Sequence, residues 1–241
     1  IKGIWCVPKY SNPQGYTYSD ETVRRLAAMP TAAADFRVFW DNAYCVHHLD
    51  MAQPAQLLDF LAECAAAGQP ERPYIFGSTS KITFPGAGLA AFAGGPETVK
   101  YVKKLMASQT IGYDKLNQLR HLRFFGDLDG LLAHMAKHAA ILQPKFQLVA
   151  DTLQKELGGL GCADWTTPNG GYFMSFDTWP GLAKKVVAMC KEAGVELTGA
   201  GATYPYGVDK EDKNIRLAPS MPPLADLQQA AELFCLCVKL A

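Results

Sequence analysis

The sequence predicts an α/β fold followed by a carboxyl-terminal α+β unit, on the strength of two patterns. In the first half, short apolar runs alternate with amphipathic stretches, which is typical of parallel strands joined by helices. After Gly158 and Gly159 the pattern changes to alternating, strand-like segments with helices between them. Hydrophobic residues make up 49% and charged residues 19% of the 241 positions, which suits a globular protein with a substantial core.

In the first half of the chain, proline and helix-capping residues mark where the predicted strands and helices end or begin. The apolar run from Ile4 to Val7 stops at Pro8 and predicts a buried strand. A helix is expected to start at Ser19 or Asp20, because such side chains cap helix amino termini, and to run to about Met29. The same reasoning predicts strands at 37–40, 74–77 and 89–93 and helices at 54–67 and 97–108.

A long helix is expected over 131–157, and it contains Pro144. Because proline removes one helix hydrogen bond, we expect a kink or a break there. Glycines and alternating apolar residues then mark out the remaining elements. These are strands at 171–176, 195–198 and 215–217 and helices at 182–193 and 226–238.

Bulk properties narrow the class of protein. The formal net charge is zero, which gives no reason to expect binding to nucleic acid or to an anionic membrane surface. The seven cysteines lack a Cys-x-x-Cys pair, so we expect reduced core cysteines in a cytoplasmic protein. No apolar run approaches membrane-spanning length. The chain opens at Ile1 in what looks like the middle of a strand, and we therefore expect a fragment.

Two predicted strand ends carry polar residues that suggest a cofactor. Lys81 closes the run Ser78-Thr79-Ser80, while Asp41 and Tyr44 follow the strand at 37–40. A lysine can form a Schiff base with an aldehyde, and the hydroxyl groups before it can bind a phosphate. An aspartate can pair with a protonated pyridine nitrogen, and a tyrosine can hydrogen-bond a phenolate. These are the contacts that pyridoxal 5'-phosphate needs.

Position along the sheet supports grouping these residues. Ligands of parallel α/β sheets bind at the carboxyl ends of the strands. Asn12, Asp41 and Lys81 each follow a predicted strand end. Each alone has an ordinary interpretation, as a turn residue, a helix cap and a surface lysine. Their order and spacing favour the cofactor interpretation.

On these motifs the chain resembles the fold-type I pyridoxal-phosphate-dependent aminotransferases of class I/II, and within them aspartate aminotransferase subgroup Ic. The resemblance covers essentially all 241 residues. It implies a partial three-layer α/β/α large domain over 1–130, a connecting helix region over 131–157 and an α+β small domain over 158–241. The motifs, in the family's order, are Asn12-Pro13-Gln14-Gly15, Asp41-Asn42-Ala43-Tyr44, Ser78-Thr79-Ser80-Lys81, Gly170-Gly171-Tyr172-Phe173 and Ile215-Arg216-Leu217.

The resemblance implies catalytic roles for three residues. Lys81 would form the internal aldimine and later shuttle a proton between the substrate's α-carbon and the cofactor. Asp41 would keep the pyridine nitrogen protonated, which makes the ring an electron sink. Tyr44 would hydrogen-bond the ring oxygen and tune the pKa of the imine.

It also implies a set of binding residues. Asn12 would contact the ring oxygen and substrate, and Ser78 and Ser80 would bind the phosphate. Arg216 would bind the substrate's α-carboxylate as a bidentate pair, for which a planar guanidinium is suited. A homodimer of the full-length protein is expected, because sites of this fold type lie between a large and a small domain at a dimer interface.

Two departures from the family pattern stand out. Many class I/II enzymes place a phosphate-binding arginine about eight residues after the lysine, whereas Leu89 stands here in the glycine-rich stretch from Gly86. Subgroup Ic sequences share that stretch, so phosphate binding is expected to rely more on backbone amides. Family members also carry roughly 150–200 further residues upstream, about one domain.

Several histidines and arginines are further candidates for site residues. His134 and His138 are four apart on a predicted helix, a spacing that can bind a metal, but no third ligand is evident and we expect none bound. His47 and His48 follow the Tyr44 turn and are more simply structural. One further segment contains arginines that could read a second carboxylate or form ordinary surface ion pairs, namely Arg120 and Arg123.

The expected reaction is transamination between an amino acid, aspartate or glutamate, and a 2-oxo acid. A β-lyase or a decarboxylase on the same scaffold is an alternative. A second alternative, from another class, is the aminotransferase-like ligand-sensing domain of a transcriptional regulator. The isolated fragment could also be inactive, with weak cofactor binding. An upstream winged helix-turn-helix would indicate the regulator, and upstream aminotransferase sequence would indicate the enzyme.

Overall fold

The computed structural model describes all residues from 1 to 241, and they form two compact units. We call them the first unit and the second unit. The first unit comprises Ile1–Ser11, Tyr16–His47 and Ala55–Ala136. The second unit comprises Asn12–Gly15, His48–Pro54 and Lys137–Ala241. The assignment of 1–130 and 158–241 to functional domains stays a prediction.

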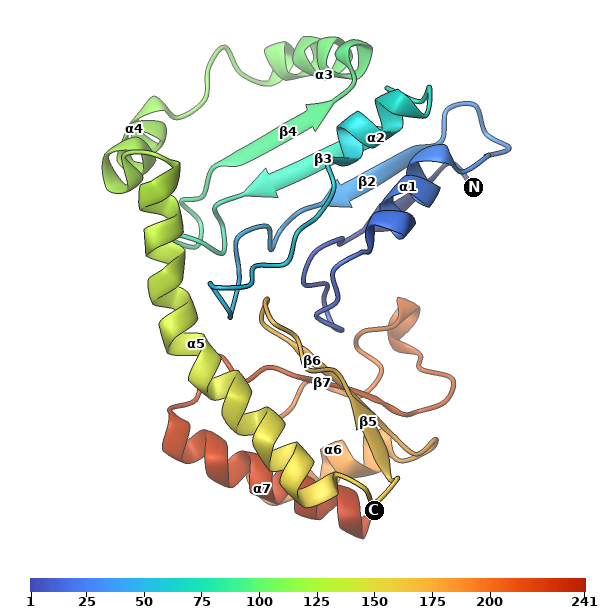
Figure 1. The fold of residues 1–241 in the computed structure, drawn as a ribbon, viewed down its shortest axis with the longest axis vertical. Helices are drawn as coiled ribbons and strands as arrows, with labels where there is room; N and C mark the ends of the chain where they lie inside the picture. Colours follow the sequence, from blue (N-terminus) through green and yellow to red (C-terminus); the bar gives the residue numbers. More distant parts are fainter. The chain divides into compact units, whose positions relative to one another are not determined.

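The first unit is built on a four-stranded sheet in the order β1-β2-β3-β4 (Figure 1). The first three strands are parallel, as predicted, whereas β4 runs antiparallel to β3. A parallel neighbour needs a crossover of a dozen or more residues, usually a helix, and the connection over 79–89 contains no helix. The strands are β1 (Gly3–Cys6), β2 (Arg37–Asp41), β3 (Pro73–Ser78) and β4 (Ala90–Gly94).

Two helices cover one face of this sheet (Figure 1). Helix α1 (Asp20–Ala28) starts where Ser19 caps it, as expected. Helix α2 (Phe60–Ala66) is shorter than the predicted 54–67, because Asp59 accepts hydrogen bonds from the first free backbone amides and sets the start there. Between the helices and the sheet, the ring of Trp40 stacks on that of Phe60 with centroids 4.1 Å apart.

The opposite face of the sheet is open and aromatic. Trp5, from β1, is 60% exposed. Its ring stacks on Phe39 and Phe76, with centroids 5.3 and 5.8 Å away. Phe92 of β4 continues the row at 5.4 Å from Phe76. We call Trp5, Phe39, Phe76 and Phe92 the aromatic face.

Three further helices come next after β4 in the chain, and the first unit contains the first two and the start of the third. Helix α3 (Pro96–Gln109) matches the predicted 97–108, and α4 (Lys115–Phe125) was not predicted. Helix α5 (Leu128–Leu157) continues through Pro144 as one helix, so the expected break does not occur. Its residues to Ala136 belong to the first unit and those from Lys137 to the second.

The second unit packs a three-stranded antiparallel sheet against helices. Met174, Phe176 and Ile215 lie in its core with almost no exposed surface, and the ring of Phe176 contacts Phe234 edge-on at 4.9 Å. Strand β5 was not predicted, and α6 and α7 match predicted helices. The elements are β5 (Ala163–Trp165), β6 (Met174–Thr178), β7 (Asn214–Leu217), α6 (Ala183–Glu192), α7 (Leu224–Leu240), the short 3-10 turn η1 (Pro205–Gly207) and the later part of α5.

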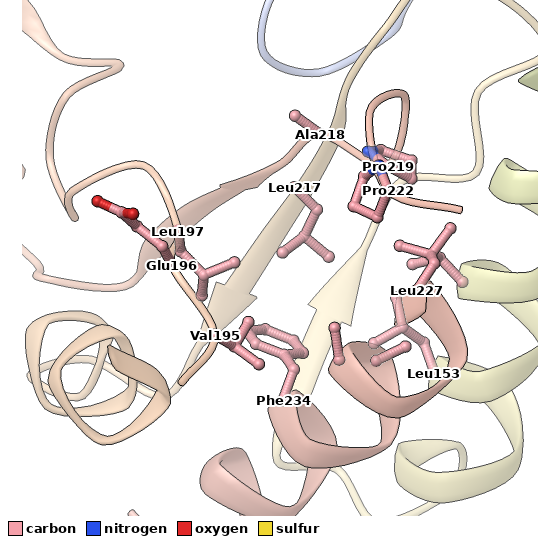
Figure 2. A pocket seen from close by; sticks show the side chains of 13 residues that line it. Leu153, Val195, Glu196, Leu197, Leu217, Ala218, Pro219, Pro222, Leu227 and Phe234 are labelled. Atoms are coloured by element: carbon pink, nitrogen blue, oxygen red, sulfur yellow. The ribbon is translucent and has the colours of Figure 1, made fainter. Parts of the chain in front are cut away.

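The strand expected at 195–198 does not form. Val195 and Leu197 pack against the core, but the sheet consists of β5, β6 and β7 alone. The segment instead borders an apolar cavity of about 110 Å³ (Figure 2). The cavity is lined by Val149, Leu153, Val195, Glu196, Leu197, Leu217, Ala218, Pro219, Pro222, Leu227, Ala230, Ala231 and Phe234. Apart from Glu196, its lining is apolar and offers no set of converging polar groups that would orient a ligand, so we regard it as a gap in the packing of the core.

All seven cysteines are free thiols, and most of them lie in the cores. Burial raises the pKa of Cys64 and Cys235 to about 12. Thiols with such pKa values stay protonated near neutral pH and are poor nucleophiles. None of the helices combines the length and the apolar character that a membrane span requires.

Candidate active site

The ends of β2 and β3 bring polar side chains to one edge of the first unit's sheet. Asp41, the last residue of β2, pairs in register with Phe76, two residues before Ser78 ends β3. Because side chains alternate along a strand, Asp41 shares the aromatic face with Phe39. Trp5 Nε1 donates a hydrogen bond to Asp41 Oδ2 at 3.4 Å. The carboxylate is therefore held by an indole at the rim of an aromatic surface.

Lys81 lies in the turn that follows β3. Its Nζ is 5.4 Å from the ring centroid of Tyr44, a distance that permits a cation–π contact. Tyr44 is buried, and it comes from the turn after β2. Ser78 Oγ donates to Ser80 Oγ at 3.1 Å, so two hydroxyl groups converge just before the lysine.

The glycine-rich loop after Lys81 closes over the serines. A Cβ atom on Gly88 would lie only 3.0 Å from Ser80 Oγ and 3.1 Å from its backbone nitrogen. A side chain at position 88 would therefore fill the space beside Ser80. Leu89 donates its backbone N–H to Thr79 Oγ1 at 2.8 Å.

The other two predicted residues, Asn12 and Arg216, meet in the second unit. Arg216 Nη1 donates to Asn12 Oδ1 at 3.1 Å, and Nη2 donates to Thr198 Oγ1 at 3.3 Å. The guanidinium carbon lies 4.5 Å from the ring centroid of Phe173. Its Nε is buried and has no hydrogen-bond partner in the protein. A buried, unsatisfied donor on a clamped guanidinium suits the binding of an anion.

The structure thus brings the predicted residues together in two groups. Asp41, Tyr44, Ser78, Ser80 and Lys81 cluster at one sheet edge of the first unit. Asn12 and Arg216 are in contact in the second. Three residues in contact with these groups were not identified as partners from the sequence, namely Trp5, Phe173 and Thr198. Phe173 belongs to a motif named above, but nothing in the local sequence marks any of the three as a contact of Asp41 or Arg216.

The first group fits pyridoxal phosphate in the chemistry of its donors. Ser78 and Ser80 offer paired hydroxyls for a phosphate, and the lack of a side chain at Gly88 leaves the hydroxyl and the backbone amide of Ser80 uncovered on that side. Asp41 offers a carboxylate for a protonated nitrogen, and Lys81 offers a primary amine. No observation in the structure conflicts with this set.

Two other groups of side chains named in the sequence analysis can be placed in the structure. The chain contains no group of three or more metal-ligating side chains, and His134 Nε2 lies 2.9 Å from the carbonyl oxygen of Ile82. Arg120 and Arg123 line an open cavity of about 540 Å³ in the first unit. Its other lining residues are Thr83, Phe84, Ala87, Asn117, His121 and Phe124.

Comparisons of this chain with a family model, with curated proteins and with solved structures all point to aminotransferases. The family model described as aspartate amino-transferase matches residues 1–241. A Mycolicibacterium smegmatis protein, provisionally named an aminotransferase, is 52% identical over all of this chain. The solved structure of an aspartate transaminase from Corynebacterium glutamicum is 48% identical over 99% of this chain, with a TM-score of 0.96. This chain spans only 56% of the length of each.

A more distant solved structure shows the same fold. It is an α-aminoadipate aminotransferase of Thermus thermophilus, complexed with N-(5'-phosphopyridoxyl)-L-leucine. It is 19% identical over 98% of this chain and 58% of its own, with a TM-score of 0.78. The α/β fold of aminotransferases is therefore the fold of this chain.

Proposed function

This chain belongs to the aspartate aminotransferase family, and from that premise we propose that it takes part in a pyridoxal-phosphate-dependent transamination. The donor is an amino acid, aspartate or glutamate, and the acceptor is a 2-oxo acid. The observation that carries the proposal is the group Ser78, Ser80 and Lys81, which lies at the end of β3 and in the turn after it, next to the strand end that bears Asp41. The pyridoxyl ligand in the Thermus structure supports the choice of cofactor.

Pyridoxal phosphate, when bound, supplies an aldehyde for an amine and a ring that takes up electrons from the substrate. Lys81 would provide the nitrogen that attaches the cofactor, and the same side-chain amine would carry the proton of the substrate's α-carbon. Asp41 holds a proton on the ring nitrogen, because a nearby carboxylate favours the charged form of a base. Ser78 and Ser80 bind the phosphate, and Tyr44 hydrogen-bonds the ring oxygen.

The second unit contributes substrate binding in this proposal. Arg216 binds the α-carboxylate, and its contacts with Asn12, Thr198 and Phe173 keep the guanidinium in one orientation. Fixing the plane of a guanidinium in advance reduces the entropy lost when it forms a bidentate pair. Asn12 both orients Arg216 and contacts the cofactor ring oxygen.

A cytoplasmic homodimer of the complete protein belongs to the same proposal. Apolar side chains are exposed along α3 and α4, and contiguous exposed apolar surface is typical of association sites. Those side chains are Tyr101, Leu105, Leu116, Leu119, Leu122 and Phe124.

The test uses the longest natural polypeptide that contains these 241 residues, with Lys81→Ala as the variant. Wild type should exchange amino groups between aspartate and 2-oxoglutarate, and Lys81→Ala should abolish turnover. Borohydride reduction followed by peptide mapping should attach the cofactor to Lys81. Lys103→Ala, at an exposed position of α3, is the matched control and should behave as wild type.

Attachment to a different lysine, or full turnover by Lys81→Ala, would overturn the proposed role. Release of the substrate's β-substituent or of carbon dioxide, without amino-group exchange, would instead indicate a lyase or a decarboxylase. Cofactor binding without any turnover would indicate a ligand-sensing domain.

A further inference from the structure

Three of the five histidines contact the short segment around Lys81. They come from three separate parts of the first unit. His47 follows β2, His121 lies in α4, and His134 lies in α5. The segment they contact is the turn and glycine-rich loop between β3 and β4, which we call the lysine loop (residues 79–89).

Two of these histidines contact backbone carbonyls beside the lysine side chain. His47 Nε2 is 3.1 Å from the carbonyl oxygen of Lys81 itself. His134 Nε2 is 2.9 Å from the carbonyl oxygen of Ile82. Since a carbonyl can only accept, each ring must carry a proton on Nε2 to make its bond. The backbone on the carboxyl side of Lys81 is therefore held, while the lysine side chain extends into an exposed region.

His121 is buried and holds the loop through its two threonines. Its Nε2 lies 3.0 Å from both Thr79 Oγ1 and Thr83 Oγ1, one on each side of Lys81. Its Nδ1 lies 2.9 Å from the carbonyl oxygen of Asn117. A neutral ring with its proton on Nδ1 donates to the carbonyl oxygen of Asn117, and its Nε2 can then accept from the hydroxyl of Thr79. The hydroxyl of Thr83 donates to the carbonyl oxygen of Thr79 at 3.2 Å, so it closes the turn around Lys81 beside the ring.

The same contacts tie the far end of the lysine loop to α4. Thr79 Oγ1 accepts the backbone N–H of Leu89 at 2.8 Å, so one hydroxyl joins both ends of the loop to His121. Asn117 Nδ2 donates to the carbonyl oxygen of Ala87 at 2.8 Å. Both ends of the loop are thus hydrogen-bonded to side chains from one turn of α4.

We propose that His121 is a positioning residue for Lys81, acting through Thr79 and Thr83 to hold the lysine loop in one conformation. This inference rests on the proposed role of Lys81 in the reaction. A reacting amine must lie within a fraction of an ångström of its productive position, and the order of an exposed lysine on a loop depends on its backbone as well as on its contact with Tyr44. His47 and His134 complete the restraint from the other side.

The test compares His121→Leu with His121→Gln in the longest natural polypeptide that contains these residues. Leucine fills the space without any hydrogen bond. Glutamine can present an oxygen near the position of Nε2 and accept from the hydroxyl of Thr79. The first readout is amide hydrogen exchange without cofactor. His121→Leu should exchange the amides of the lysine loop about tenfold faster or more, since lost restraints lower the local opening energy.

Turnover is the second readout. His121→Leu should lower kcat about tenfold with little change in the KM for the amino acid, because only the position of the amine is affected. His121→Gln should restore both readouts substantially. Gln118→Ala, on the exposed side of the same helix, is the control and should change neither.

Unchanged exchange in the lysine loop of His121→Leu would overturn the proposal. So would a uniform increase over the whole first unit without rescue by glutamine, because that would reveal a purely structural histidine. The two hypotheses fail separately. If peptide mapping attaches the cofactor to another lysine while the exchange effect persists, the function is wrong and the restraint on the loop stands.

Discussion

The sheet of the second unit buries the aromatic ring of Phe176 against helices, whereas the sheet of the first unit leaves aromatic rings exposed on the face opposite its helices. Phe176 has no exposed surface, and its ring contacts Trp165 and Phe234. In the first unit, Val38 is fully buried under the helices, but Trp5 on the opposite face is 60% exposed. The same chain thus contains one closed core and one half-covered sheet.

This difference in burial indicates which sheet requires further cover from polypeptide. Parallel sheets in α/β proteins are normally covered on both faces, and exposed aromatic patches of this kind mark association surfaces. We therefore expect further polypeptide to cover the aromatic face in the complete protein. The apolar residues of the second unit's sheet, such as Met174 and Phe176, are already buried without such a cover.

The units also differ in the chemistry that they carry. The first unit gathers an amine, a carboxylate and hydroxyls around a sheet edge, which suits holding a cofactor. The second unit presents a clamped guanidinium, which suits holding a carboxylate. The following predictions test each side of this comparison.

The largest expected effect is on packing. Phe176→Ala should lower the free energy of unfolding by about 3–5 kcal/mol, because it leaves a large cavity in a closed core. Phe39→Ala, on the aromatic face, should cost about 1 kcal/mol in the 241-residue chain, mainly through lost ring contacts. Urea unfolding followed by circular dichroism measures both.

The same pair of variants tests whether the aromatic face becomes covered. In the longest natural polypeptide, Phe39→Ala should approach the cost of Phe176→Ala. A cost that stays near the value for the 241-residue chain would show that the face remains open to solvent.

Asp41→Ala should lower turnover by a factor of a hundred or more, about 3 kcal/mol, while part of the cofactor binding survives. In the proposed role of Asp41, the variant removes the negative charge that would keep the ring nitrogen of the cofactor protonated. Visible absorbance titration with pyridoxal phosphate separates binding from turnover. Asp35→Ala, at an exposed aspartate that pairs with Lys2, is the control. Near wild-type turnover in Asp41→Ala would rule out its role.

Arg216→Lys should raise the KM for every amino-acid donor by roughly thirtyfold, about 2 kcal/mol, because lysine cannot form the bidentate pair. Steady-state kinetics with aspartate, glutamate and alanine provide the measurement. Arg120→Lys and Arg123→Lys serve as counterparts in the first unit, and should affect dicarboxylic donors alone if either reads the second carboxylate. If Arg216→Lys affected dicarboxylic donors alone, Arg216 would bind the side-chain carboxylate of the substrate and another group would bind the α-carboxylate.

The smallest effect concerns acid stability of the second unit. Burial raises the pKa of Asp209, but hydrogen bonds from the backbone of Asn214, Lys213 and Glu211 outweigh it and hold the pKa below its usual range. A lowered folded-state pKa contributes stability above the unfolded value, near 4, and that stability is lost as the pH falls through the folded value.

Asp209→Asn should therefore cost about 1–2 kcal/mol at pH 7. Its unfolding curve should converge on that of wild type as the pH drops below about 4, the ordinary aspartate value. Asp164→Asn, at an exposed position of β5, is the control. A difference between Asp209→Asn and wild type that is independent of pH would contradict this account.

Local sequence patterns were sufficient for the elements whose signals act within a few residues. Ser19 caps α1 where the sequence places a cap, and the apolar run around Val38 forms β2 within one residue of its expected bounds. Capping and side-chain alternation depend on near neighbours, so they can be predicted without the rest of the fold. Asp59 is an equally local signal that the longer helix prediction overlooked.

Elements that depend on a distant partner could not be predicted in this way. Val195 and Leu197 have the composition of a strand, yet no neighbouring strand pairs with them. The antiparallel direction of β4 likewise follows from the helix-free connection after β3. Pairing is decided when segments far apart in sequence meet, and composition carries little information about it.

The sequence by itself determined which chemical groups the candidate site contains, namely the amine of Lys81, the carboxylate of Asp41 and the guanidinium of Arg216. Only the tertiary structure decided what holds them in place. Thr198 lies 18 residues from Arg216, and His121 lies 42 residues from Thr79. The chemical type of a side chain is given directly by the sequence, but its orientation depends on contacts that exist only after distant segments have packed together.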